Sequence, residues 1–316
     1  MNLHRVFIVD GRLRPLWRFF LSAVLLFVAY LVAREALGVA YLALGHPPGP
    51  VAAFFWGALA TLLTVLAAFK LLTAVFERRP LGSVGLAFHG RWWRELGHGL
   101  AIGAAMILIV AGLEWAGGLA QFTFAPQPLL RAAALTFLLL LVAAINEEVM
   151  FRGYPFQRLV ESITPVGAIA VTSVLFGLMH LGNPHHTWFS TANTMLVGIP
   201  LAVAYLRTRS LWMPIGIHFI WNFLMGFLLG LPVSGITFPV SVIAARVRGA
   251  AWLTGAEYGP EGGGLATVVI VAATFYLVFS KRIYTTEEMR ALVFDPVPEC
   301  EPGQPITLFA AGSTKE

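Results

Sequence analysis

The chain has 316 residues, of which 58% are hydrophobic and only 12% are charged. Soluble domains carry about 25% charged residues, so this composition excludes an ordinary soluble protein and predicts an integral membrane protein. The 21 basic residues outnumber the 16 acidic ones. They fall in alternate connections between apolar runs, so we expect membrane lipid as a partner and no nucleic acid.

Eight apolar runs are long enough to cross a bilayer, which needs about 17 to 25 residues each. They predict an all-α fold, a polytopic membrane helical bundle of about eight transmembrane helices. The runs cover 16–33, 51–74, 99–119, 130–149, 164–182, 188–206, 211–231 and 264–280. Glu114, near the end of the third run, is expected to snorkel to the interface as a structural residue.

The domain organisation follows from these runs and from the loops between them. Tryptophans mixed with arginines in 77–98 predict an interfacial segment, and Gly and Pro clusters in 232–263 predict an external loop. We therefore expect an N-terminal transmembrane region, a catalytic membrane core, an external loop with the last transmembrane helix, and a cytoplasmic tail, at 1–129, 130–231, 232–283 and 284–316. The single cysteine, Cys300, lies in the tail and forms no intrachain disulfide.

Three formal charges stand at the end of the fourth run, in the stretch INEEVMFRGY at 145–154. Each costs about 2.5 to 3.5 kcal/mol at the centre of a spanning helix, so such charges indicate function. Glu148 and Arg152 are four residues apart, with the acid first, which is the favoured order for an ion pair on one helical face. Glu147 points about 100° away from that face. It therefore stays available to take and return a proton.

Two later runs each carry a histidine that is four positions from a phenylalanine or an asparagine. Phe176 and His180 form one such pair in FGLMH, and His218 and Asn222 form the second in HFIWN. Members of each pair share a helical face. A single histidine in a spanning helix is most often a packing or hydrogen-bonding residue. Together with the glutamates, however, these pairs predict one polar site between helices.

The three motifs resemble those of the membrane-embedded CAAX prenyl endopeptidases and their bacterial relatives, the CAAX-protease and bacteriocin-processing (CPBP, or Abi) proteins. The resemblance covers about 130–228, on the fourth to seventh runs. It implies an intramembrane endopeptidase that hydrolyses a peptide bond. In that family the roles would fall on matching positions, with Glu147 and His180 activating a water. Glu148 and Arg152 would support the site, and His218 with Asn222 would form the oxyanion hole.

A metal remains an alternative at this stage. Two histidines and a glutamate are able to provide the three protein ligands of a catalytic zinc site, which would make the protein a metalloprotease. The ligands come from three helices rather than from one HExxH helix, and their spacing demands no metal. We therefore favour the glutamate mechanism without a cofactor and keep zinc as the alternative.

The resemblance also implies a substrate, which would be a peptide or a protein tail with a hydrophobic or lipidated part that approaches through the bilayer. Short loops and alternating arginines predict a multi-pass protein of the bacterial cell membrane with both termini cytoplasmic. Two other functions stay open. One is a non-catalytic immunity or scaffold protein of the same family, against which the complete set of six residues argues. The other is a proton-coupled transporter, against which the absence of inverted repeats argues.

Overall fold

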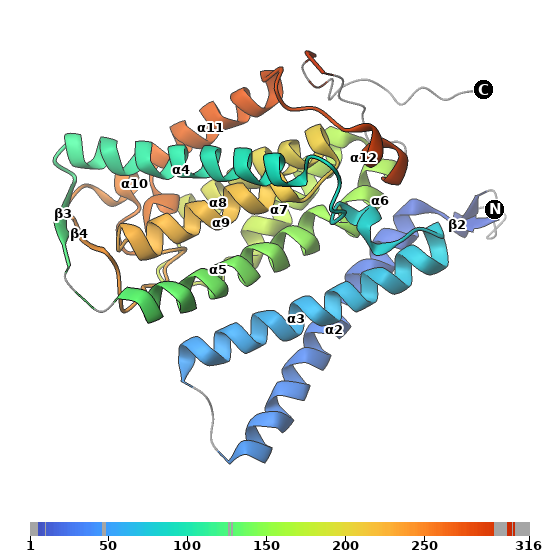
Figure 1. Cartoon of the computed structure of the whole chain (residues 1–316), viewed down its shortest axis with the longest axis horizontal. Coiled ribbons are helices and arrows are strands. Elements are labelled where there is room, and N and C mark those ends of the chain that lie inside the picture. The colour runs from blue at the N-terminus through green and yellow to red at the C-terminus, as the bar shows by residue number, and fades with distance from the viewer. Residues whose placement is uncertain are drawn as a thin grey trace.

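The computed structural model describes residues 6–9, 11–45, 49–125, 127, 129–293, 302–304 and 306. It is an all-α polytopic membrane bundle (Figure 1). Cys300 and most of the predicted tail lie outside the described residues.

Each of the eight predicted runs forms a helix. The long helices are α2 (Pro15–Leu44), α3 (Pro50–Leu72), α4 (Trp92–Ala116), α5 (Leu129–Arg152), α7 (Pro165–Met179), α8 (Trp188–Thr208), α9 (Trp212–Phe223) and α11 (Gly264–Phe279). Among the described residues, six helices are long and apolar enough to cross a membrane. The helix Trp212–Leu228, which is α9 with the π-helical turn η3 (Leu224–Leu228), is apolar but shorter, and so is α11.

Several short elements have no counterpart in the predictions. Helix α6 (Tyr154–Ser162) follows α5 directly after Gly153, and α12 (Glu287–Leu292) lies in the predicted tail. Strand β3 (Ala120–Phe124) pairs antiparallel with β4 (Ile243–Val247). The remaining elements are β1 (Ile8–Val9), β2 (Arg12–Leu13), η1 (Thr73–Glu77), η2 (Leu81–Val84), α10 (Ala251–Thr254), η4 (Ala256–Tyr258) and η5 (Pro260–Gly262). Because α4 begins at Trp92, the last part of the expected interfacial segment belongs to this helix.

Helices α4 and α9 approach each other closely because glycines face the contact. A Cβ atom on Gly99 would lie 2.2 Å from the carbonyl oxygen of Met213, and one on Gly103 would lie 2.4 Å from that of Ile217. Small residues allow helix backbones in membranes to meet in this way. The contact fixes the position of α9, which carries His218 and Asn222.

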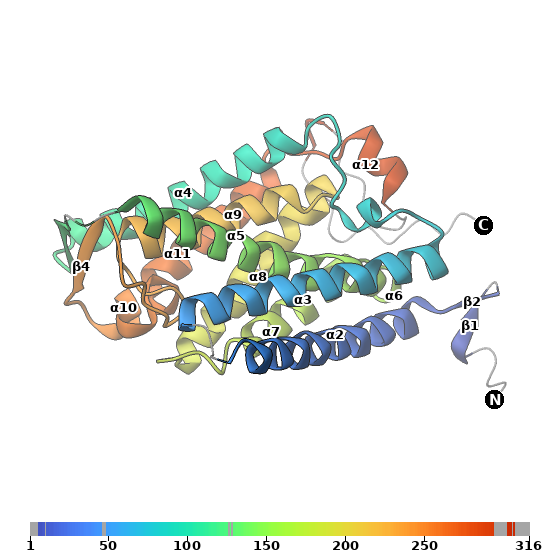
Figure 2. The ribbon, with the colours of Figure 1, turned by 60° about the horizontal axis from the view of Figure 1, so that its bottom comes forward.

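The N-terminal hairpin of α2 and α3 flanks the rest of the bundle, with α3 against α5 and α2 against α6 (Figures 1 and 2). A buried ionic network joins these elements. Glu77, at the end of η1, accepts hydrogen bonds from Arg18 of α2 at 2.5 Å and from the Tyr154 hydroxyl at 2.9 Å. Arg158 of α6 lies 2.9 Å from the same oxygen and 2.9 Å from Glu161. Because each charge has an opposite partner, the network is compatible with burial.

The expectation that Glu114 reaches the interface is wrong. Its side chain is fully buried, and neither carboxylate oxygen forms a hydrogen bond within the described residues. The physical reason is that α4 packs against α9, α11 and β3, and this packing encloses the side chain.

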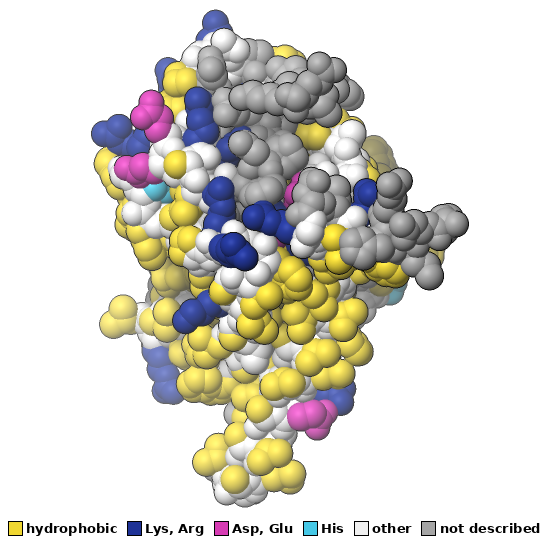
Figure 3. Space-filling view, turned by 90° about the vertical axis from the view of Figure 1, so that its right-hand side faces the viewer, with side chains coloured by type: hydrophobic (Ala, Val, Ile, Leu, Met, Phe, Trp, Pro, Cys, Tyr) yellow, Lys and Arg dark blue, Asp and Glu magenta, His cyan; other side chains and the backbone are white. Residues whose placement is uncertain are grey.

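The two ends of the bundle carry different elements. Strands β3 and β4 lie at one end, while α12 and the described N-terminal residues lie at the other (Figure 1). Figure 3 looks at the second end and shows Lys and Arg side chains beside hydrophobic ones. The cytoplasmic placement of this end stays a prediction.

Candidate functional site

Helix α5 carries the first part of the site. Glu148 Oε1 accepts a hydrogen bond from the Arg152 guanidinium at 3.1 Å, and both side chains are fully buried. A second nitrogen of Arg152 donates to the carbonyl oxygen of Gly198 in α8 at 3.2 Å. The ion pair predicted from the four-residue spacing is therefore present, and it also ties α5 to α8.

Glu148 holds a second partner that sequence spacing did not reveal. His218 Nδ1, from α9, lies 2.8 Å from the same Oε1 atom. An ionised carboxylate only accepts hydrogen bonds, so the ring must donate through Nδ1. Glu148 thus fixes both the Arg152 guanidinium and the orientation of the His218 ring.

His180 is oriented by the end of its own helix. Helix α7 ends at Met179, so His180 occupies the C-cap position. Its Nδ1 atom lies 2.7 Å from the carbonyl oxygen of Phe176, one of the last carbonyls that lack an intrahelical partner. A carbonyl oxygen only accepts, so Nδ1 is again the donor. The neutral rings of both histidines therefore present Nε2 as an acceptor.

The two histidines and Glu147 meet at one point. Glu147 Oε2 lies 3.8 Å from His180 Nε2 and 3.8 Å from His218 Nε2. This oxygen is buried and forms no hydrogen bond within the described residues, although the Glu147 side chain as a whole is 32% exposed. With neutral rings all three atoms are acceptors, so the group suits a small molecule with protons to donate, such as water.

Phe176 packs against three residues of the site, His180, His218 and Arg152. Its ring centroid lies 4.8 Å from that of His180 and 6.1 Å from that of His218. The Arg152 guanidinium lies over its face, 4.6 Å from the ring centroid, in the geometry of a cation–π contact. The aromatic residue of the second motif thus contacts a residue from each of the other two.

Asn222 stands apart from the other five candidates. It is buried in α9, one turn beyond His218, and its Oδ1 atom forms no hydrogen bond among the described residues. Hydrogen bonds and ion pairs at 4 Å or less connect Glu147, Glu148, Arg152, His180 and His218. In the described part of the chain, none of these contacts includes Asn222.

Glu261, in η5 of the 232–263 loop, was missed by the sequence reasoning. Its Oε1 atom accepts from Trp221 Nε1 at 3.0 Å, and its Oε2 atom accepts from the Ser234 backbone nitrogen at 2.8 Å. Trp221 directly precedes Asn222, so this carboxylate anchors the loop to the part of α9 that carries the third motif. An acidic residue in a Gly-rich loop gives no signal of such a distant contact.

Within the described ranges, no group of three or more His, Cys, Asp or Glu side chains has the arrangement to hold a metal ion. Zinc stays the alternative to the glutamate mechanism.

Comparisons with known proteins point to one family. Residues 129–224 match the family described as "Type II CAAX prenyl endopeptidase Rce1-like". The chain is 32% identical over 82 residues to "Putative membrane peptidase YdiL" of Bacillus subtilis (strain 168). The matched stretch is 26% of this chain and 32% of the relative. The match thus spans about a third of that relative's length. No solved structure matches the chain.

Proposed function

We propose that this chain, which over residues 129–224 is similar to the Rce1-like CAAX prenyl endopeptidases, is a membrane-embedded endopeptidase of the CAAX protease (CPBP) family. In this proposal Glu147 activates a water molecule that hydrolyses a peptide bond. The observation that carries it is the position of Glu147 Oε2, which faces the Nε2 atoms of His180 and His218 at 3.8 Å each and forms no hydrogen bond in the described part.

The chemistry needs one group that takes a proton and returns it. Water donates one proton to Glu147 Oε2 while its oxygen attacks the carbonyl carbon of the scissile bond. Glu147 then passes this proton to the departing amide nitrogen, and the carbon–nitrogen bond breaks. His180 Nε2 accepts the second water proton as a hydrogen bond and so aligns the attacking oxygen. Its Nδ1 contact with the Phe176 carbonyl supports this orientation.

The negative charge that develops on the carbonyl oxygen needs donors, each worth about 2.7 to 4 kcal/mol in rate. We assign this role to the Asn222 side-chain amide and to His218. His218 Nδ1 donates to Glu148, so its Nε2 atom, an acceptor in the neutral ring, donates only in the imidazolium. The proposal therefore assigns His218 the imidazolium form in this step and His180 the neutral form. Glu148, which is paired with Arg152, holds the His218 ring, and both residues stay outside the proton transfer.

The substrate in this proposal is a peptide or a protein tail with a hydrophobic or lipidated part. Glu147 lies in an apolar helix of the bundle, so a substrate reaches it from the bilayer or along the bundle interior. We further place the protein in a bacterial cell membrane with both termini in the cytoplasm, on the support of its short loops and the positions of its arginines.

The decisive experiment is cleavage of a peptide library by the purified full-length chain in detergent, read by mass spectrometry. We expect cleavage by the parent protein and none by Glu147→Gln. Glu257→Gln, which changes an exposed carboxylate of the external loop, serves as the matched control and should cleave like the parent. A scaffold or immunity role would give peptide binding without products in all three proteins.

A second arm treats the parent with a zinc chelator and then adds zinc back. The glutamate mechanism expects unchanged cleavage. Loss that zinc restores would instead assign Glu147, His180 and His218 as ligands, with their rings already oriented by hydrogen bonds from Nδ1.

A further inference from the structure

Several basic residues lie in the segments where α4 begins and α11 ends. These segments are at the end of the bundle that carries α12 (Figure 1). Arg91 is the N-cap of α4, Arg94 follows in its first turn, and His98 lies one turn later on the same face. Arg282 follows the last residue of α11 by three positions. These four residues and Tyr284 help to line one small cleft, here called the basic cleft.

The charges of the basic cleft do not balance. Its one carboxylate, Glu95, is buried and already lies 3.1 Å from His89 Nε2. Arg94 and Arg282 are exposed, and neither forms an ion pair with an acidic side chain in the described part of the chain. The guanidinium groups of Arg91, Arg94 and Arg282 thus share the cleft with a single carboxylate, Glu95, which is already paired with His89. Such an arrangement favours an anion from outside the protein.

The first turn of α4 adds to this preference. It has no side-chain cap, and the N-terminus of a helix carries a partial positive charge that favours anions. Helix polarity and the arginines therefore act in the same direction.

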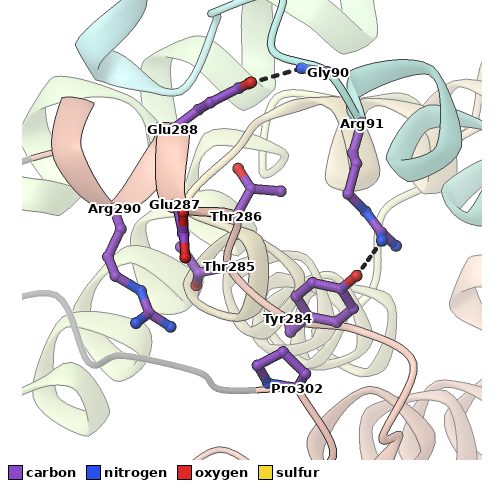
Figure 4. A pocket seen from close by; sticks show the side chains of 9 residues that line it. All are labelled: Gly90, Arg91, Tyr284, Thr285, Thr286, Glu287, Glu288, Arg290 and Pro302. Atoms are coloured by element: carbon purple, nitrogen blue, oxygen red, sulfur yellow. Dashed lines mark hydrogen bonds between the residues drawn. The ribbon is translucent and has the colours of Figure 1, made fainter.

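A larger cavity adjoins the basic cleft. It measures about 450 Å³ and shares Arg91 and Tyr284 with the cleft. In Figure 4 the Arg91 guanidinium reaches the Tyr284 hydroxyl, while Thr286 and Glu287 face the same space. The volume is within the range of small-molecule sites, about 300 to 1,000 Å³. A polar headgroup attached to an anion in the cleft therefore has room beside it.

Aromatic rings place this region at the membrane surface. Phe88, Trp92 and Trp212 pack together with ring centroids 4.9 to 5.2 Å apart. Phe88 is 73% exposed and Trp93 is 56% exposed. Exposed aromatic residues at the ends of spanning helices are typical of the headgroup level of a bilayer. The anion available at that level is a lipid phosphate, and basic pockets between spans are known to bind such groups.

We propose that the basic cleft binds the phosphate of an anionic phospholipid, whose headgroup extends into the adjoining cavity. The site lies outside the group formed by Glu147, His180 and His218, and the inference does not depend on the endopeptidase activity.

The test uses the full-length chain in a neutral detergent and counts bound lipid by native mass spectrometry during titration with dioleoyl phosphatidylglycerol. The test variant is Arg94→Gln with Arg282→Gln. The matched control is Arg246→Gln with Arg248→Gln, two exposed arginines of β4 and the residue after it, at the other end of the bundle. We expect about 30-fold weaker lipid binding in the test variant, from two lost cation contacts, and parental binding in the control.

Melting temperatures without added lipid accompany the titration, and since the two arginines are exposed, the test variant should melt like the parent. Zwitterionic dioleoyl phosphatidylcholine should bind the parent less tightly than phosphatidylglycerol does. Equal binding of phosphatidylglycerol to the test variant and the parent would overturn the proposal, as would equal losses in the test variant and the control. A separate arm adds inorganic phosphate, and full competition at the same concentration as the lipid would overturn the lipid assignment in favour of a free-phosphate site.

Discussion

At the scale of residues, the site depends on one buried carboxylate. Glu148 accepts from Arg152 and from His218 through a single oxygen atom, while Glu147 keeps an oxygen without a hydrogen-bond donor in the described part. Two adjacent glutamates with the same chemistry therefore have different surroundings. Glu148 supports other side chains, and Glu147 faces the centre of the group.

Replacement of each glutamate by glutamine should separate these roles. Glu147→Gln keeps the shape and leaves every observed hydrogen bond of Glu148 in place, so we expect lost hydrolysis and a nearly parental melting temperature. Glu148→Gln leaves Arg152 as a buried cation without its counter-charge, which typically costs about 3 to 5 kcal/mol. A parental rate for Glu147→Gln would contradict the assignment of the base.

A double-mutant cycle tests the ion pair itself. Glu148→Gln combined with Arg152→Gln removes both buried charges, so part of the stability lost in Glu148→Gln should return. Activity should stay low, because His218 is then held by an uncharged amide. Thermal or denaturant unfolding of the parent, both single variants and the double variant gives the coupling energy. Strictly additive losses would show that the pair contributes no coupling.

The sequence predicts that the motifs meet between helices, but it predicts a specific hydrogen-bond partner only within one helix. The four-residue spacing of Glu148 and Arg152 determines their shared face, and that pair is present. The contact between His218 and Glu148 joins residues 70 positions apart. It depends on how α9 is rotated against α5, and spacing along the chain carries no information about that rotation.

At the scale of elements, the packing of α4 against α9 positions the third motif. A segment that crosses lipid must bond its backbone polar groups internally as a helix and must present apolar side chains to the lipid. Such a helix is therefore recognisable in the sequence as a long apolar run. All eight helices could be predicted for this reason. Short elements such as α6 and the β3–β4 pair could not, since their hydrogen bonds and burial depend on neighbours distant in the sequence.

Gly103→Ala should disturb the position of α9. Its new Cβ would meet the carbonyl oxygen of Ile217, directly before His218, at 2.4 Å. The backbones must then separate, which we expect to cost about 1 to 3 kcal/mol and to lower hydrolysis. Gly112→Ala on the same helix is the matched control, because a Cβ there meets nothing within 4 Å. Unfolding and peptide cleavage are measured for both, and equal behaviour would contradict the proposed packing role.

At the scale of the whole molecule, the prediction concerns orientation in the membrane. Residue 250 and helix α12 lie at opposite ends of the bundle (Figure 1), and the excess of basic residues predicts that the α12 end is cytoplasmic. In a Cys300→Ser background, Ala250→Cys and Glu287→Cys give single thiols at exposed positions on the two ends. A reagent that cannot cross the membrane should label position 250 in intact cells and position 287 only after lysis. The reverse pattern would invert the topology.

The anchoring of the 232–263 loop by Glu261 also has a consequence for biosynthesis. The ribosome delivers Glu147 and His180 to the membrane before His218, and the loop that fastens α9 through Trp221 emerges later still. Synthesis proceeds at about 5 to 20 residues per second. For several seconds after His180 is made, the chain therefore has its first two motifs, while α9 is either not yet made or not yet bound by Glu261. If the proposed endopeptidase activity requires α9 to be fastened in this way, an unfinished chain should be inactive until residue 261 has been made.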